Sequence, residues 1–176
     1  IAKDYNGEGD INNTYAELFD MAVSSYGAAD DNNNHYTNSS CSINTAYGDA
    51  YQVNATCRFN VWYYANNASW NITVRVNDSY NLADLSSNVI TINSLLSLGL
   101  PGSIDYGLVN ATNVSNEATA NVTNFGNVAL NLSLSGYGVT YGDNLSMNCT
   151  LGTIKNISIG YERYNLSSSN LGALTP

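Results

Sequence analysis

The clearest structural signal in this sequence is the alternating stretch Trp70-Asn71-Ile72-Thr73-Val74-Arg75-Val76-Asn77. Apolar and polar residues take turns along it, so a β-strand places the apolar side chains on one face and the polar ones on the other. Residues 51–64 alternate in the same way, and the turn residues Ala65-Asn66-Asn67-Ala68 lie between the two stretches. The pattern predicts a β-hairpin.

The same alternation recurs in the rest of the chain. Further strands are expected at residues 89–92, 104–109, 118–122, 128–134, 145–151 and 154–161. The link Asn124-Phe125-Gly126-Asn127 predicts a hairpin turn, whereas residues 14–24 carry apolar side chains at helical spacing and predict one short helix. Short strands at regular spacing, with turn residues between them, are typical of β-sandwiches.

The segment Leu98-Gly99-Leu100-Pro101-Gly102-Ser103 carries the strongest breaker residues and predicts a domain boundary. We therefore predict an all-β fold with two Ig-like antiparallel β-sandwich domains in tandem, at residues 1–97 and 98–176. The polar leading segment, residues 1–40, is expected to be irregular or to be donated to the sheet of a neighbouring chain. No run approaches the roughly 20 apolar residues of a membrane helix, so no direct membrane span is expected.

Composition and charge narrow the class of partner. Of the 176 residues, 44% are hydrophobic, which is enough for a core, and only 11% are charged. An ordinary domain has roughly 25% charged residues, so Asn, Ser and Thr supply the polarity here. The formal charge of −9 repels nucleic acid and anionic membranes. We expect neither as a partner.

The strongest functional signal is the N-glycosylation motif Asn-x-Ser/Thr. Composition alone predicts roughly five or six copies in such a chain. The chain has fourteen, at Asn12, Asn38, Asn54, Asn67, Asn71, Asn77, Asn110, Asn113, Asn121, Asn131, Asn144, Asn148, Asn156 and Asn165. Several alternate with the apolar residues of expected strands and so fall on the outward face. The alternative is a polar strand face that favours Asn and Thr for other reasons.

The three cysteines fit a secreted protein, in which disulfides are allowed. Cys41 and Cys57 lie in the same half of the chain and are expected to pair, whereas Cys149 faces inward on its strand and reads as a buried free thiol. The absence of a CxxC pair and of a nearby histidine counts against a zinc or redox site.

Catalytic chemistry is hard to build from these residues. The only histidine, His35, lies in a polar loop and reads as a solvated surface residue, and the glutamates are scattered. No phosphate loop or GxSxG elbow is present. We expect no enzyme activity.

One stretch, Asp4 to Asn12, is similar to the start of an EF-hand calcium loop, but its twelfth position is Tyr15 instead of a bidentate carboxylate. We therefore predict a polar loop, no metal site and no cofactor apart from N-linked glycans. Calcium near Asp4–Asp10 is the alternative. The fourteen tyrosines also have two readings, which are ordinary β-propensity and contacts to subunits or sugar rings.

Two stretches resemble known modules. Residues 57–74 (CRFNVWYYANNASWNITV) are similar to Ig-like β-sandwich modules of secreted archaeal surface proteins. Residues 120–136 (ANVTNFGNVALNLSLSG) resemble the NxGNxxLxLxLSG hairpin of the module that often follows. The resemblance implies an archaeal cell-surface or extracellular location with N-glycans, and it brings no catalytic residues.

These observations favour a structural subunit that self-assembles into an extracellular, pilus-like filament, possibly by donor-strand exchange. Its partners would be further copies of itself and other cell-surface glycoproteins. Two alternatives stay open, namely a surface-layer lattice component, and an adhesin or carbohydrate-binding module that uses exposed tyrosines and Trp62.

Overall fold

The computed structural model describes residues 1–110, 112–148 and 156–166. Antiparallel strands dominate this part of the chain, and its only helices are the single-turn 3-10 helices η1 (Glu8–Asp10) and η2 (Ile159–Tyr161). The all-β prediction is confirmed. None of the helices in these ranges has the length and apolar character that crossing a bilayer requires.

The chain forms two compact units, and the first of them includes a segment from later in the sequence. The first unit is Ile1–Gly99 together with Thr123–Ala129, and the second is Leu100–Val122 together with Leu130–Pro176. The predicted division into domains 1–97 and 98–176 does not include the return of Thr123–Ala129 to the first unit. The predicted turn at residues 124–127 lies in the returning segment. There β9 (Thr123–Asn124) pairs with β8 (Leu98–Gly99).

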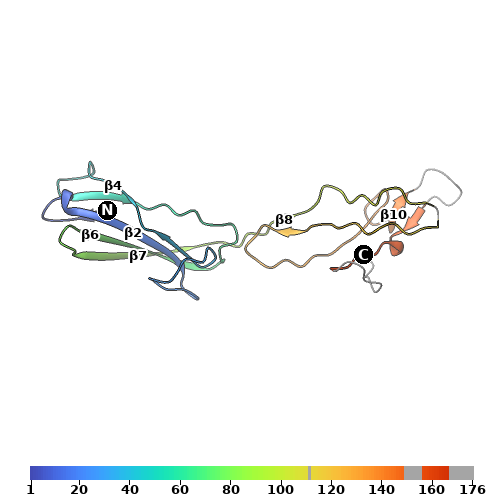
Figure 1. Cartoon of the computed structure of the whole chain (residues 1–176), viewed down its shortest axis with the longest axis horizontal. Helices are drawn as coiled ribbons and strands as arrows, with labels where there is room; N and C mark the ends of the chain where they lie inside the picture. The colour runs from blue at the N-terminus through green and yellow to red at the C-terminus, as the bar shows by residue number, and fades with distance from the viewer. Residues whose placement is uncertain (111, 149–155, 167–176) are drawn as a thin grey trace. The chain divides into compact units, whose positions relative to one another are not determined.

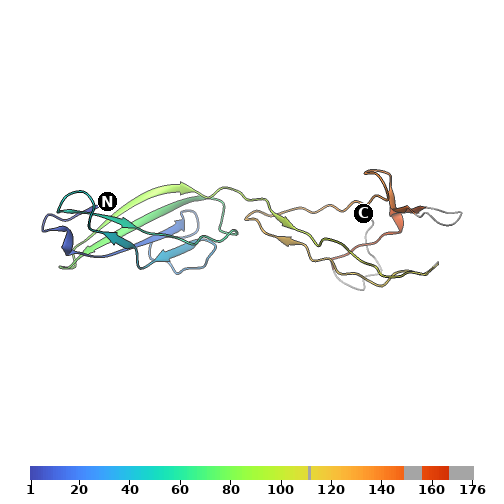
Figure 2. The same ribbon diagram turned by 90° about the horizontal axis from the view of Figure 1, so that it is seen from above.

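The larger sheet of the first unit has four antiparallel strands (Figures 1 and 2). Their order is β3 (His35–Asn38), β2 (Ile11–Asp20), β6 (Ser69–Asp78) and β7 (Ala83–Thr91). The alternating stretch of residues 70–77 lies within β6, where it is paired on both sides.

The helix predicted at residues 14–24 is wrong, and the leading segment of residues 1–40 is irregular only in part. Ile11–Asp20 forms β2, a strand in the interior of the sheet. Thr14, Ala16 and Leu18 are buried on one face, while Glu17 and Phe19 are buried on the other. Because both faces are covered, the apolar residues do not alternate with period 2, and the helical spacing in the sequence is misleading.

The second sheet of this unit contains β1 (Ala2–Lys3), β5 (Gln52–Thr56) and β4 (Ser42–Asn44), in the order β1-β5-β4. The predicted hairpin of 51–64 with 70–76 is therefore wrong, since β5 and β6 belong to different sheets. Strand β5 ends at Thr56, directly before the disulfide cysteine at 57, and residues 57–68 form a loop between the sheets.

The buried core of the first unit centres on Trp70, whose side chain has no exposed surface. It packs with Leu18, Tyr36 and Ala65. The Trp70 indole Nε1 donates a hydrogen bond of 2.8 Å to the backbone oxygen of Asn66, so the ring is both enclosed and hydrogen-bonded.

In the described part of the second unit, β10 (Leu145–Asn148) pairs with β11 (Asn156–Ser158) in a short ladder. The segments 104–109, 118–122 and 128–134, expected as strands, form no strand ladder in the described part of the chain. The expected strands at 145–151 and 154–161 are described only in part, since residues 149–155 lie outside the described ranges.

Candidate functional site

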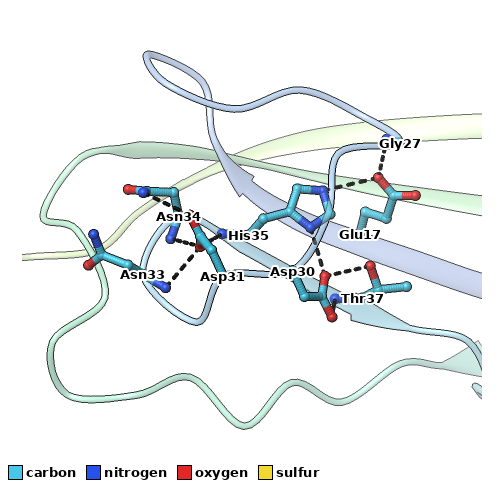
Figure 3. A network of polar contacts seen from close by, with 8 residues as sticks. All are labelled: Glu17, Gly27, Asp30, Asp31, Asn33, Asn34, His35 and Thr37. Carbon is cyan, nitrogen blue, oxygen red and sulfur yellow. Dashed lines mark hydrogen bonds and ion pairs between the residues drawn. The ribbon is translucent and has the colours of Figure 1, made fainter.

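A network of polar side chains surrounds the buried His35, at the start of β3 (Figure 3). Its Nδ1 lies 2.8 Å from Oδ1 of Asp30, and its Nε2 lies 3.3 Å from Oε2 of Glu17. The ring stacks on Phe19 with centroids 5.8 Å apart and 10° between the planes. The prediction of a solvated surface histidine is wrong, because this side chain has no exposed surface.

The loop that precedes β3 is held by two neighbouring carboxylates. Asp31 Oδ1 accepts hydrogen bonds from the backbone N–H groups of Asn33, Asn34 and His35, at 3.0, 2.6 and 3.0 Å. The bond from the Asn34 backbone is the main cause that lowers the pKa of Asp31. Burial acts against ionisation of Asp30, but hydrogen bonds from His35 and Thr37 outweigh it and lower the pKa of Asp30.

The geometry of this network suits a structural role, in which it fixes a loop to the sheet. Both ring nitrogens of His35 face carboxylates, and the ring is shielded from water, so neither nitrogen faces open solvent. Glu17 also accepts a hydrogen bond of 2.6 Å from the backbone N–H of Gly27. The network thereby ties the loop of residues 21–34 to the face of β2 that carries Glu17 and Phe19.

A groove opens beside β7, one of the edge strands of the first unit. It has a volume of about 700 Å³, and its lining includes residues 1–4 and residues 82–88. Among the described residues, no strand pairs with the outer edge of β7. The backbone N–H groups of Leu85 and Val89 instead donate to the side chains of Asp84 and Asn88, both at 2.9 Å. These local bonds occupy part of an edge that a further strand could use.

The second unit leaves its apolar side chains uncovered. Among the residues described there, none is buried. Leu132 and Leu134, from one alternating stretch, are 55% and 52% exposed, and Leu108 is 99% exposed. Exposure of so many large apolar side chains is typical of a surface that binds another segment or chain.

The asparagines of the glycosylation motifs fall into two groups by exposure, apart from Asn148, whose side chain is not described. Nine residues are exposed, namely Asn12, Asn67, Asn110, Asn113, Asn121, Asn131, Asn144, Asn156 and Asn165. Four are half-buried, namely Asn38, Asn54, Asn71 and Asn77.

Two of the half-buried asparagines, Asn71 and Asn77, were expected to point outward from β6. The Oδ1 atom of Asn71 is buried and has no hydrogen-bond partner, and Oδ1 of Asn77 accepts a bond of 3.0 Å from Nε of Arg75. The face of β6 that carries them is continuous with the face of β2 that the loop 21–34 covers. The alternation of the sequence identifies their face, but it does not reveal that a loop lies across this face.

Cys41 and Cys57 form a disulfide with Cα atoms 4.5 Å apart. The bond joins the start of β4 to the end of β5, two strands that already pair through Ser42 and Thr56. Cys149, expected as a buried thiol, lies outside the described residues.

The calcium-like stretch uses its oxygens locally. Asp4 Oδ1 accepts a hydrogen bond from the backbone N–H of Asn6, at 2.8 Å, and Asp10 Oδ1 accepts one from the Ser79 hydroxyl, at 3.2 Å. The Tyr15 hydroxyl lies 2.7 Å from that of Tyr26. In the described ranges, no three His, Cys, Asp or Glu side chains come together as a metal site. The absence of a metal site stays a prediction, and calcium near Asp4–Asp10 stays its alternative.

Four exposed aromatic side chains form an aromatic patch in the first unit, made of Trp62, Tyr63, Tyr64 and Phe125. Sequence reasoning singled out the tyrosines and Trp62 but placed Phe125 in a turn of the second domain. The patch exists because the segment Thr123–Ala129 returns to the first unit, and no local pattern in the sequence signals this return.

Comparison of the chain with protein-family models, with curated proteins and with solved structures finds no match.

Proposed function

We propose that this chain is an extracellular, N-glycosylated structural subunit that assembles head to tail into a filament by exchanging an N-terminal strand. The observation that carries the proposal is the second unit, in whose described part no side chain is buried. A strand supplied by a neighbouring copy would cover these residues and complete an Ig-like sandwich. The two units would then form tandem sandwiches within the polymer.

The donor is the segment before β2. Its strand β1 pairs with β5 through two residue pairs, Ala2 with Val53 and Lys3 with Gln52. The Asp4 and Glu8 N–H groups add hydrogen bonds to the carbonyls of Tyr51 and Ala50, so few backbone contacts must break for the segment to detach. Residues 1–4 already line an apolar groove of their own unit, which supports their fitting a similar groove elsewhere. The expectation that residues 1–40 are donated narrows to residues 1–10, because Ile11–Asp20 is an interior strand of its own sheet.

Such an exchange makes an open polymer when the rotation between neighbouring copies does not close. A donor at one end and an acceptor unit at the other form a heterologous contact, which propagates as a thread when the rotation does not close. The exposed sequon asparagines occur in both units, so sugars would cover the thread and prevent lateral association. Other cell-surface glycoproteins remain expected partners at its ends.

Electron microscopy of native extracellular material, without heat or denaturant, tests the proposal. Threads of uniform width are the expected result. Two-dimensional sheets would favour the surface-layer alternative, and dispersed monomers would favour the adhesin.

Two matched substitutions then locate the acceptor. Leu132→Lys places a charge on the uncovered surface of the second unit, and Leu85→Lys places one in the groove of the first unit; the two side chains are similarly exposed, at 55% and 52%. We expect Leu132→Lys and deletion of residues 1–4 to abolish threads, whereas Leu85→Lys leaves them. Loss of threads only with Leu85→Lys would move the acceptor to the edge of β7, and threads from all three variants would exclude strand exchange.

A further inference from the structure

The aromatic patch has the shape of a carbohydrate contact. Trp62 and Tyr64 stack with centroids 5.8 Å apart and 11° between the planes, and they are 51% and 37% exposed. Tyr63 meets Tyr64 edge-on at 5.2 Å and Phe125 at 5.9 Å. Flat aromatic surfaces with no charged member suit the apolar C–H faces of pyranose rings.

The loop that carries the patch is fixed before any ligand binds. The backbone N–H of Ala65 donates to the Trp62 carbonyl at 3.0 Å, and the Asn66 N–H donates to the Asn33 carbonyl at 2.9 Å. The Asn66 side chain donates to Asp20 Oδ2 at 2.8 Å. A ligand therefore binds without the entropy cost of ordering this loop.

A sugar acceptor lies in the same loop. Asn67 is exposed and belongs to the sequon Asn67-Ala68-Ser69, three residues after Tyr64. Three residues span at most about 10 Å, which one or two linked pyranose units can cover. A glycan tethered there meets the rings at high effective concentration. Of the sequons in the first unit, only Asn12 and Asn67 are exposed, and only Asn67 shares this loop.

We propose that the first pyranose residues of an N-glycan on Asn67 pack against Trp62 and Tyr64, so that the patch binds the chain's own sugar. The inference rests on the proposed glycosylation and adds the place where one glycan folds back on the protein. Because the sugar covers otherwise wetted aromatic surface, it stabilises the first unit.

The two tryptophans of the chain make the contact measurable. Trp70 has no exposed surface, so quenching of tryptophan fluorescence by acrylamide in the natively glycosylated protein reports on Trp62. We expect Asn67→Gln to increase this quenching and to lower the Tm by about 3 °C, which corresponds to roughly 1 kcal/mol for a chain of this length. The matched control Asn12→Gln removes the other exposed sequon of the unit and should change neither quantity. In a Tyr64→Ala background the effect of Asn67→Gln on the Tm should shrink toward zero.

Each contrary result has a distinct meaning. Glycan found on Asn67 by mass spectrometry, with quenching and Tm unchanged in Asn67→Gln, overturns this inference and leaves the filament proposal intact. Sugar on other sequons but not on Asn67 has the same consequence. Quenching that differs only between assembled and dissociated protein assigns the patch to a subunit contact instead. A chain without sugar at any sequon overturns both this inference and the proposal of a glycoprotein.

Discussion

Nδ1 of His35 lies 2.8 Å from a carboxylate oxygen of Asp30, in a ring that has no exposed surface. On its other side the ring faces Glu17, whose side chain is also almost fully buried. The imidazole thus lies between a buried carboxylate, Glu17, and a half-exposed one, Asp30, on a face of the sheet. A buried carboxylate is costly unless it is paired, so this arrangement makes the loop before β3 depend on the histidine.

Replacing the histidine should therefore destabilise the first unit. His35→Ala removes the imidazole beside Glu17 and leaves this buried carboxylate with the Gly27 N–H. We expect a loss of about 3 kcal/mol in the free energy of unfolding, measured by denaturant titration. Thr37→Val, which removes only the hydroxyl bond to Asp30, should cost less than about 1.5 kcal/mol. Equal losses in the free energy of unfolding for the two variants would mean that His35 contributes no more to stability than the Thr37 hydroxyl.

The loop of residues 138–145 should respond to acid through Asp143. Its carboxylate accepts backbone hydrogen bonds from Thr140, Val139, Leu145 and Gly138, with the bond from Thr140 the largest cause, and these lower its pKa to about 2.

Because the folded pKa lies below the ordinary value of 3.8, the stabilising contribution of Asp143 is present above pH 4 and is lost as the pH falls through about 2. Carboxyl NMR should give a midpoint near that value. Exchange of the Val139 and Thr140 amide protons should accelerate in Asp143→Asn at neutral pH. A midpoint near 3.8 would contradict the hydrogen-bonded loop.

Reduction of the Cys41–Cys57 bond should lower stability by about 3 kcal/mol, as chain entropy predicts for a loop of this length. For 176 residues this corresponds to a fall in Tm of about 6–12 °C. The measurement compares Cys41→Ser/Cys57→Ser with Cys149→Ser by differential scanning calorimetry. A similar fall in Cys149→Ser would show that the third cysteine matters as much as the pair.

The two tryptophans should differ sharply in their contribution to the free energy of unfolding. Trp70→Ala removes a fully buried side chain and its hydrogen bond, so we expect a loss of about 4 kcal/mol. Trp62→Ala removes a half-exposed side chain and should cost less than about 1 kcal/mol. Denaturant titration of both variants gives the comparison, and losses of similar size would place the core elsewhere.

Sugar occupancy should follow exposure. An attached glycan must remain in water in the folded protein, so the nine exposed asparagines are expected to carry sugar more completely than Asn38 and Asn71. The Asn38 amide already donates a bond of 2.7 Å to the Arg58 carbonyl, and Oδ1 of Asn71 is buried. Peptide mass spectrometry of native protein measures the occupancy at each site. Full occupancy of Asn71 would mean that the loop 21–34 opens to admit a sugar.

The sequence predicts a strand best where its apolar residues lie on a single face. Strand β6 carries its apolar residues on a single face, and its alternation was sufficient to place it. Strand β2 is covered on both faces, so its alternation is lost and a helix was the natural reading. The pairing of β5 failed for another reason, since strand partners depend on contacts between sheets that no local pattern encodes.

The buried network could have been found in part from the sequence. Glu17 stands inside the apolar run Ala16-Glu17-Leu18-Phe19, and a charge in such a run needs a buried partner. The chain offers a single histidine, directly after several polar residues that suggest a surface loop. What the sequence could not reveal is that the same polar residues fold back, with Asp30 and Asp31 as their anchors, and enclose the ring.

Hydrogen bonds of the Asn127 side chain should hold the chain together after a single proteolytic cut between the units. This side chain donates to the carbonyls of Ala65 and Asn93, both at 3.0 Å, and accepts from the Leu95 N–H at 2.6 Å. The chain passes between its two units after Gly99, after Val122 and again after Ala129. A protease that cuts once within residues 100–122 therefore leaves two fragments that still share the ladder of β8 with β9 and the bonds of Asn127. Such a nicked protein would run as two bands on a denaturing gel and as one species in native chromatography.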